Sequence, residues 1–189
     1  RALLIFPEAF LSKQAQDDFA QIFGNLEFPR TAISNVGKNG IIHQEPDDDV
    51  VKVIRGNEGW HHDSTYMPVQ ALGAVFTADI VPDEGGLTGW ADMRAAYDAL
   101  DLHTQEKVDT LSAFHSYYYS QGRDGYLPNN QNDDGTYNAY GFHDGEACLR
   151  PLVKMHPVTK LPNLLIGRHA HNVTGMDETE SEEFMDGLN

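Results

Sequence analysis

The chain has 189 residues, of which 29 are acidic and 13 are basic, so its formal net charge is −16. This balance disfavours binding to nucleic acid or to anionic membrane surfaces. The single cysteine, Cys148, excludes an internal disulfide framework and a cysteine-based zinc site, and it fits a reducing cytoplasm. No apolar run approaches the about 20 residues that a membrane-spanning helix needs.

The first half of the chain combines predicted strands with one helix. Ser12 is a good N-cap and Gly24 a good stop for that helix. The β-branched residues of 50–54 favour a strand. The predicted elements of this half are a strand at 2–6, a helix at 12–23, a loop at 31–49 with one short strand near Ile33, and strands at 50–54 and 73–81.

The second half begins with two short predicted helices. Asp92 caps the first, at 93–100, and Thr104 caps the second, which has Val108 and Leu111 on its apolar side. Two strands, at 149–156 and 161–166, follow around a turn at 158–160. Asp177 and Glu180 have the spacing of a capping box, which predicts an amphipathic helix with Phe184 and Leu188 on one face.

Residues 115–148 differ from the rest because they are rich in Tyr, Asn, Asp and Gly and show no sustained period. A stretch of this length within a compact domain favours a functional lid. The alternative is a surface loop that packs its own aromatic side chains. The tyrosines behind this prediction are Tyr117, Tyr118, Tyr119, Tyr126, Tyr137 and Tyr140.

The pattern of strands, short helices and long loops lacks the alternation of parallel βαβ units. We therefore expect a mixed α+β fold, mostly antiparallel, in a single domain over residues 1–189.

The segment of residues 60–66, Trp-His-His-Asp-Ser-Thr-Tyr, is the richest in chemistry. His61 and Asp63 are two residues apart, so an extended backbone places both side chains on one face. Imidazole and carboxylate ligands suit the facial triad of non-haem Fe(II) oxygenases. The spacing alone is weak, because His43 and Glu45 form a second such pair and a solvated loop explains either one.

Other chemistries find less support. No Ser or Cys lies in a nucleophile-elbow context, and Gly85-Gly86 lacks the spacing of a phosphate-binding loop. His169 and His171 are ligand or substrate candidates, or simply packed histidines. The cations that could hold an anionic substrate are Arg55, Arg94, Arg150 and Arg168.

Several segments in order resemble the Fe(II)/2-oxoglutarate-dependent dioxygenases of the taurine dioxygenase family, and more closely its 2,4-dichlorophenoxyacetate dioxygenase branch. Together the segments cover nearly the whole chain. They are residues 19–27, 33–36, 60–66, 85–100 (GGLTGWADMRAAYDAL), 156–159 and 165–173 (LIGRHAHNV).

The resemblance implies a role for individual residues. His61 and Asp63 match the first two iron ligands, and Thr88 matches a threonine that hydrogen-bonds 2-oxoglutarate. Positions that match the substrate site are Asn57, Tyr66 and His169. The resemblance assigns no role to His62 or His171.

The resemblance further implies a double-stranded β-helix (jelly-roll) core with flanking helices, here incomplete at both ends. The third iron ligand, a histidine, and the arginine that binds 2-oxoglutarate are expected beyond residue 189. The implied reaction uses Fe(II), O₂ and 2-oxoglutarate to hydroxylate a small organic anion, an aryloxyalkanoate or a sulfonate, with release of succinate and CO₂.

Two alternatives stay open. A catalytically incomplete fragment folds or associates without turnover, and a cupin-like metal isomerase or hydrolase would use His61 and Asp63 but leave Thr88 unexplained. We expect a cytoplasmic protein with a small anionic substrate and O₂ as partners, no nucleic acid or membrane partner, and a homo-oligomer as one way to cover an incomplete β core.

Overall fold

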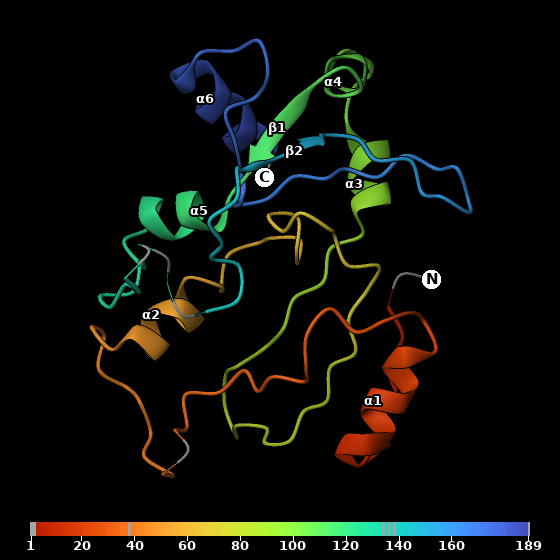
Figure 1. Cartoon of the computed structure of the whole chain (residues 1–189). Helices are drawn as coiled ribbons and strands as arrows, with labels where there is room; N and C mark the ends of the chain where they lie inside the picture. The colour runs from red at the N-terminus through yellow and green to blue at the C-terminus, as the bar shows by residue number, and fades with distance from the viewer. Residues whose placement is uncertain (1–2, 38, 134, 136, 138, 189) are drawn as a thin grey trace. The chain divides into compact units, whose positions relative to one another are not determined.

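The structure is a computed structural model that describes residues 3–37, 39–133, 135, 137 and 139–188. The chain divides into two compact units, Arg1–Ala32 with Ala71–Asp92, and Ile33–Gln70 with Met93–Asn189. Figure 1 shows the helices and strands of the chain, most of them labelled. In the described part of the chain, no helix has the length and apolar character to cross a membrane.

The first unit contains one helix, α1 (Lys13–Gln21). Its predicted cap is confirmed, because the Ser12 side chain accepts a hydrogen bond from the Ala15 N–H at 3.2 Å. The Phe19 ring packs edge-on against Phe6 and Phe23, with centroid distances of 6.1 and 5.4 Å. These contacts hold α1 against the segment that precedes it.

Two strands predicted in this unit are wrong. Residues 3–6 and 73–81 form no strand in the structure, and Ala2 lies outside the described residues. A strand needs a neighbour for its N–H and C=O groups, and the sheet that the structure describes contains strands from the other unit alone. The side chains of Leu4, Ile5 and Val81 are correspondingly exposed.

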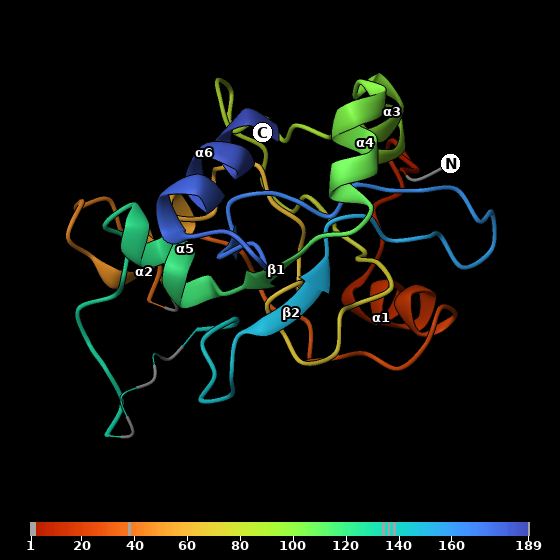
Figure 2. The same cartoon turned by 90° about the horizontal axis from the view of Figure 1, so that it is seen from above.

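The second unit is built on a three-stranded antiparallel sheet with the order β2-β1-β3. The strands are β1 (Ser112–His115), β2 (Cys148–Pro151) and β3 (Ala170–His171). Figure 2 shows β1 and β2 side by side, paired with Phe114 opposite Leu149. The fold is therefore mixed α and β with an antiparallel sheet, as the sequence predicts.

The strands predicted at 149–156 and 161–166 are only partly right, because β2 ends at Pro151 and residues 161–166 form no strand. An isolated bridge joins Val153 to Leu164, and no strand near Ile33 is present among the described residues. The turn at 158–160 is closed by a hydrogen bond from the Lys160 N–H to the His156 carbonyl at 2.9 Å. The two segments thus lie together as predicted, with less regular pairing.

Three predicted helices surround the core of this unit: α3 (Met93–Ala99), α4 (Leu102–Val108) and α6 (Glu178–Leu188). The cap of α4 is Asp101 and not Thr104, since Asp101 accepts a hydrogen bond from the Thr104 N–H at 3.0 Å. The Asp177 carboxylate accepts one from the Glu180 N–H, as the capping box predicts. The buried core is Val108, Ala113, Leu152, Leu164, Ile166, Ala170, Val173 and Met185.

The strand predicted at 50–54 is wrong, because these residues lie in helix α2 (Asp49–Arg55). The Asp48 side chain caps the helix by accepting from the Val50 N–H at 2.8 Å. Asp49 then adds an acid to the first turn, where the helix dipole favours negative charge. Local capping therefore outweighs the β-propensity of the valines.

The tyrosine-rich region starts with the last residue of β1 and helix α5 (Tyr117–Arg123). Its aromatic side chains form a buried cluster, in which Tyr117, Tyr137 and Phe142 pack together with Tyr66. Positions 134, 136 and 138 of the predicted lid lie outside the described residues. The lid at 115–148 stays a prediction.

Candidate metal and substrate site

The backbone of the segment before His61 lies directly against residues 167 and 168. The Arg168 N–H donates to the Trp60 carbonyl at 3.0 Å. Gly167 has a φ of +129°, and a Cβ at this position would lie 3.0 Å from Trp60 O and 3.1 Å from His61 Cα. A glycine at 167 is therefore what allows this close approach.

His61 and Asp63 converge as the sequence predicts. His61 Nε2 lies 3.2 Å from Asp63 Oδ1, and His61 Nδ1 donates to the Gly59 carbonyl at 2.6 Å. The Asp63 carboxylate raises the pKa of His61, while burial of the ring acts in the opposite direction. With Nδ1 as the donor, a neutral ring would direct the Nε2 lone pair at a carboxylate oxygen. A cation, either a proton or a metal ion, must therefore lie between the two atoms.

The spacing of this pair fits a metal ion. Two neighbouring ligand atoms with bonds of about 2.1 Å lie about 3.0 Å apart when they subtend a right angle at the metal. The carbonyl that holds His61 Nδ1 is the kind of partner that fixes the tautomer of a ligating histidine. The side chains are 19% and 52% exposed, so the pair is open to solvent. Among the described residues, no group of three or more His, Cys, Asp or Glu side chains could hold a metal ion, at this site or at another.

His169 lies next to this pair but is fully buried. Its ring packs edge-on against the rings of His61, at 5.3 Å, and Tyr66, at 4.7 Å between centroids. Burial lowers the pKa of His169 to about 2, with His61 and Arg168 adding to the shift, so the ring is neutral. Tyr66 is also buried. His169 therefore packs on His61, and Tyr66 packs on His169, so the two rings form a buried aromatic layer next to the metal-binding pair. The role of both residues toward substrate stays a prediction.

Asn57 and Thr88 occupy different positions in the molecule. Asn57 follows α2 and is half-buried, with an Oδ1 atom that is buried and has no hydrogen-bond partner. Thr88 is exposed and belongs to the first compact unit, described above by itself. The roles assigned to both by resemblance stay predictions.

Reasoning from the sequence missed the residues that support His61 from behind. Arg168 has been considered as a cation for an anionic substrate, but its guanidinium binds the Asp124 carboxylate and donates to the Ser120 carbonyl. The Ser120 hydroxyl lies 2.8 Å from His169 Nδ1. No local pattern links α5 to residues 59–61, which are separated from it by about 60 positions of sequence.

The remaining histidines of this region are partly or fully buried. Burial lowers the pKa of His115 to about 3, and both of its ring nitrogens lack hydrogen-bond partners. Burial also lowers the pKa of His62. His171 stacks on Tyr119 at 4.3 Å between centroids. These contacts make packing a sufficient account of His171.

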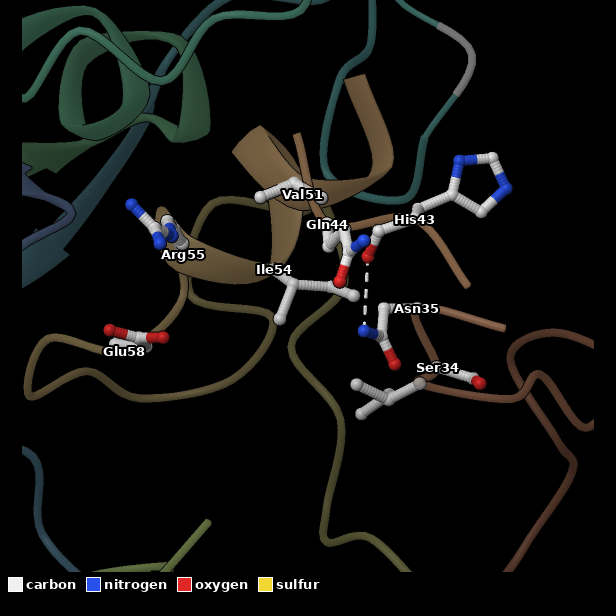
Figure 3. Close-up of a pocket in the computed structure, with 9 residues that line it drawn as sticks. Ser34, Asn35, His43, Gln44, Val51, Ile54, Arg55 and Glu58 are labelled. Carbon is white, nitrogen blue, oxygen red and sulfur yellow. Dashed lines mark hydrogen bonds between the residues drawn. The ribbon is translucent and has the colours of Figure 1, made fainter. Parts of the chain in front are cut away.

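A pocket of about 400 Å³ lies beside α2 and is shown in Figure 3. The Asn35 side-chain amide donates to the His43 carbonyl at 3.0 Å on one wall, and Val51 and Ile54 of α2 form another. Arg55, one of the candidate cations, lines it, whereas none of the residues that the resemblance assigns to metal, 2-oxoglutarate or substrate does. A second pocket of about 250 Å³ is lined by Trp60, Ser120, Arg123, Asp124, Arg168 and Asp186.

A mixed fold with a neighbouring histidine and carboxylate suits a metal-dependent oxygenase class. The family described as "Taurine catabolism dioxygenase TauD, TfdA family" matches residues 1–189. The chain belongs to this family.

Particular relatives narrow the comparison. The (S)-phenoxypropionate/alpha-ketoglutarate-dioxygenase of Sphingobium herbicidovorans is 54% identical over 188 residues, which cover 99% of this chain and 65% of that protein. The alpha-ketoglutarate-dependent 2,4-dichlorophenoxyacetate dioxygenase of Cupriavidus pinatubonensis is 31% identical over 95% of this chain and 65% of its own length. The chain thus spans about two thirds of these curated relatives, at 65%.

A crystal structure of AAD-2 in complex with Mn(II) and N-oxalylglycine superposes with a TM-score of 0.84. The sequences are 31% identical, and the match covers 100% of this chain and 66% of that one. The described fold is therefore shared with a protein that binds a divalent metal ion.

Proposed function

We propose that the protein is an Fe(II)- and 2-oxoglutarate-dependent dioxygenase that hydroxylates phenoxyalkanoates or similar small organic anions. The observation that carries this proposal is the His61–Asp63 pair, 3.2 Å apart, in a chain that is 54% identical to a phenoxypropionate dioxygenase. N-oxalylglycine, bound in the AAD-2 crystal, has the two carboxylates and the keto oxygen of 2-oxoglutarate. This supports 2-oxoglutarate as the cosubstrate.

The proposed reaction couples hydroxylation of the substrate to decarboxylation of 2-oxoglutarate. The substrate C–H bond, O₂ and 2-oxoglutarate give the alcohol, succinate and CO₂. On a 2-phenoxypropionate the hydroxyl would be placed on the carbon that carries the ether oxygen, and the resulting hemiketal collapses to a phenol and a keto acid. Fe(II), when bound, supplies the oxidising chemistry.

The residues of this chain would bind and orient. His61 and Asp63 hold the metal, with Gly59 O keeping Nε2 of His61 available. The Thr88 hydroxyl would donate a hydrogen bond to a carboxylate of 2-oxoglutarate. Asn57 would contact the substrate, and the aromatic layer of Tyr66 and His169 would keep water away from the reacting carbon.

The test measures succinate and phenol from (S)-2-phenoxypropionate with purified protein, Fe(II), 2-oxoglutarate and O₂. We expect Asp63→Ala to abolish both products. Glu45→Ala is the matched control, because Glu45 is the acid of the second His-x-acid pair, where His43 binds Asp48 instead. Succinate formation that survives Asp63→Ala would refute the site.

A second candidate is the catalytically incomplete fragment. The observation in its favour is that the described residues hold two of the three expected metal ligands, without a third nearby. A cooperative thermal unfolding transition together with no succinate from the wild-type chain would support this alternative.

We also propose that the antiparallel sheet β2-β1-β3 is part of a double-stranded β-helix, that the protein forms a homo-oligomer, and that it is cytoplasmic. Family membership supports the first, and the many exposed apolar side chains, such as Ile80 and Leu87, support the second. The low cysteine content is compatible with the third. Light scattering during gel filtration tests the oligomer, and a monomer would contradict it.

A further inference from the structure

We infer that Arg168 and Ser120 are positioning residues that fix the orientation of the His61 ring. This inference rests on the proposed function in so far as His61 is a metal ligand. Ser120 belongs to helix α5, and Arg168 is bound to the same helix. Neither is expected to touch the metal or the substrate.

Arg168 holds the backbone to which His61 is bonded. Its backbone N–H donates to Trp60 O at 3.0 Å, a bond that other residues at 168 also form, and its side chain packs on Gly59, where a Cβ would lie 3.1 Å from Arg168 Cδ. Gly59 O is the acceptor for His61 Nδ1 at 2.6 Å. A shift of Gly59 therefore turns the His61 ring and moves its Nε2 atom away from Asp63.

Helix α5 anchors Arg168 in turn. The Arg168 guanidinium donates to Ser120 O at 3.0 Å and binds the carboxylate of Asp124, the C-cap of α5. The Arg168 side chain is only 11% exposed, whereas the Asp124 side chain is 45% exposed, so the guanidinium is shielded from water while its carboxylate partner is not. The helix thus holds the guanidinium of Arg168, and the aliphatic part of the same side chain packs on Gly59.

Ser120 supports the His61 ring by a second route. Its hydroxyl donates to Tyr117 O at 3.0 Å and lies 2.8 Å from His169 Nδ1. A hydroxyl has one hydrogen, so both bonds form together only if His169 Nδ1 is the donor in the second. Ser120 thereby sets the tautomer and angle of the His169 ring, whose edge packs against His61.

The chain provides a matched control for this network. Arg123, also on α5, pairs with Asp186 of α6 at 3.3 Å, and these side chains are 42% and 60% exposed. The pair joins the same helix to a neighbour and lines the pocket of about 250 Å³ that Arg168 also lines. The hydrogen bonds of the Arg123 guanidinium go to Tyr119 and Asp186, and not to residues 59–61. If Arg168 contributed to general stability alone, Arg168→Gln and Arg123→Gln would differ in unfolding free energy, but the two folded variants would bind Mn(II) equally well.

The first experiment uses Mn(II) alone as the probe and measures its dissociation constant by electron paramagnetic resonance. Loss of outer-shell partners typically weakens metal binding 10- to 100-fold. We expect about a tenfold or greater loss in Arg168→Gln and in Ser120→Ala, and less than about twofold in Arg123→Gln. Asp124→Asn, on an exposed carboxylate, gives the same test if Arg168→Gln fails to fold.

The second experiment needs no metal. Correlation of ¹⁵N and ¹H signals shows which imidazole nitrogens carry a hydrogen and whether that hydrogen is held in a hydrogen bond. We expect the hydrogen-bonded Nδ1–H signal of His61 to be lost in Arg168→Gln, and that of His169 to be lost in Ser120→Ala. Folded variants with wild-type tautomers and Mn(II) affinity would overturn the inference. If wild-type protein binds no Mn(II), or binds it equally well after Asp63→Ala, the proposed function fails, and the tautomer measurement alone decides the inference.

Discussion

The substitution Gly167→Ala tests whether the close approach of residue 167 to His61 holds the metal-binding segment in place. An alanine Cβ at this position would lie 3.0 Å from Trp60 O and 3.1 Å from His61 Cα. Both neighbours are backbone atoms, so neither can rotate away like the end of a flexible side chain. The segment that carries His61 must move, or the alanine must distort its own backbone.

Two costs add to give the expected magnitude. Holding a non-glycine residue at a φ of +129° costs about 1–3 kcal/mol. Overpacking a tight contact costs about 1–3 kcal/mol more. The sum of about 2–6 kcal/mol is a large share of the about 5–15 kcal/mol that stabilises a typical domain.

Gly175→Ala is the control that separates the two costs. Gly175 also has a positive φ, +84°, but a Cβ there would have no atom within 4 Å. Urea unfolding should therefore show Gly167→Ala to be less stable than Gly175→Ala by about 1–3 kcal/mol. Only Gly167→Ala should weaken Mn(II) binding. Equal unfolding free energies with equal Mn(II) affinities in the two variants would refute the reasoning.

Three further predictions concern stability. Gly187→Ala should raise the unfolding free energy by about 0.5–1 kcal/mol in urea melts, because Gly187 lies in α6 with open space around it; no gain would contradict this. Leu152→Ala should cost about 2–5 kcal/mol, since Leu152 is fully buried, whereas Leu161→Ala, half-exposed, should cost less than about 1 kcal/mol in the same assay. The His43 hydrogen bond lowers the pKa of Asp48 below its ordinary 3.8. The contribution of this pair to the unfolding free energy is therefore complete above pH 3.8 and is lost as the pH falls through the lowered pKa. Asp48→Asn should therefore flatten the acid side of a stability–pH profile below about pH 4, and an unchanged slope would count against the pair.

The helices could be predicted from sequence where their signals are local. Ser12 and Asp177 each bind an N–H three residues further on, so the sequence contains the complete cap. The strand predicted at 50–54 failed because its apolar residues also fit a helix. Val51 and Ile54, three positions apart, lie on one side of α2 against the same pocket.

Strands could be predicted less well, since pairing depends on distant residues. The β-branched run at 73–81 has the composition of a strand, yet the structure pairs it with no neighbour among the described residues. Residues 112–115, by contrast, were not predicted as a strand. They become β1 because segments 148–151 and 170–171 lie on both sides of them.

The two His-x-acid pairs show what decides the candidate site. Both have the same spacing, but His43 turns its Nδ1 atom to Asp48 at 2.7 Å, whereas His61 faces Asp63 through Nε2. The two histidines present different nitrogens because Gly59 O accepts a hydrogen bond from Nδ1 of His61. Gly59 is in turn packed against Arg168, which lies more than 100 residues further along the chain. Spacing supplies the pair of ligands, and contacts distant in sequence determine which nitrogen is available. A search for metal sites by spacing alone therefore finds both pairs, and the partners of the Nδ1 atoms, Asp48 for His43 and Gly59 O for His61, distinguish them.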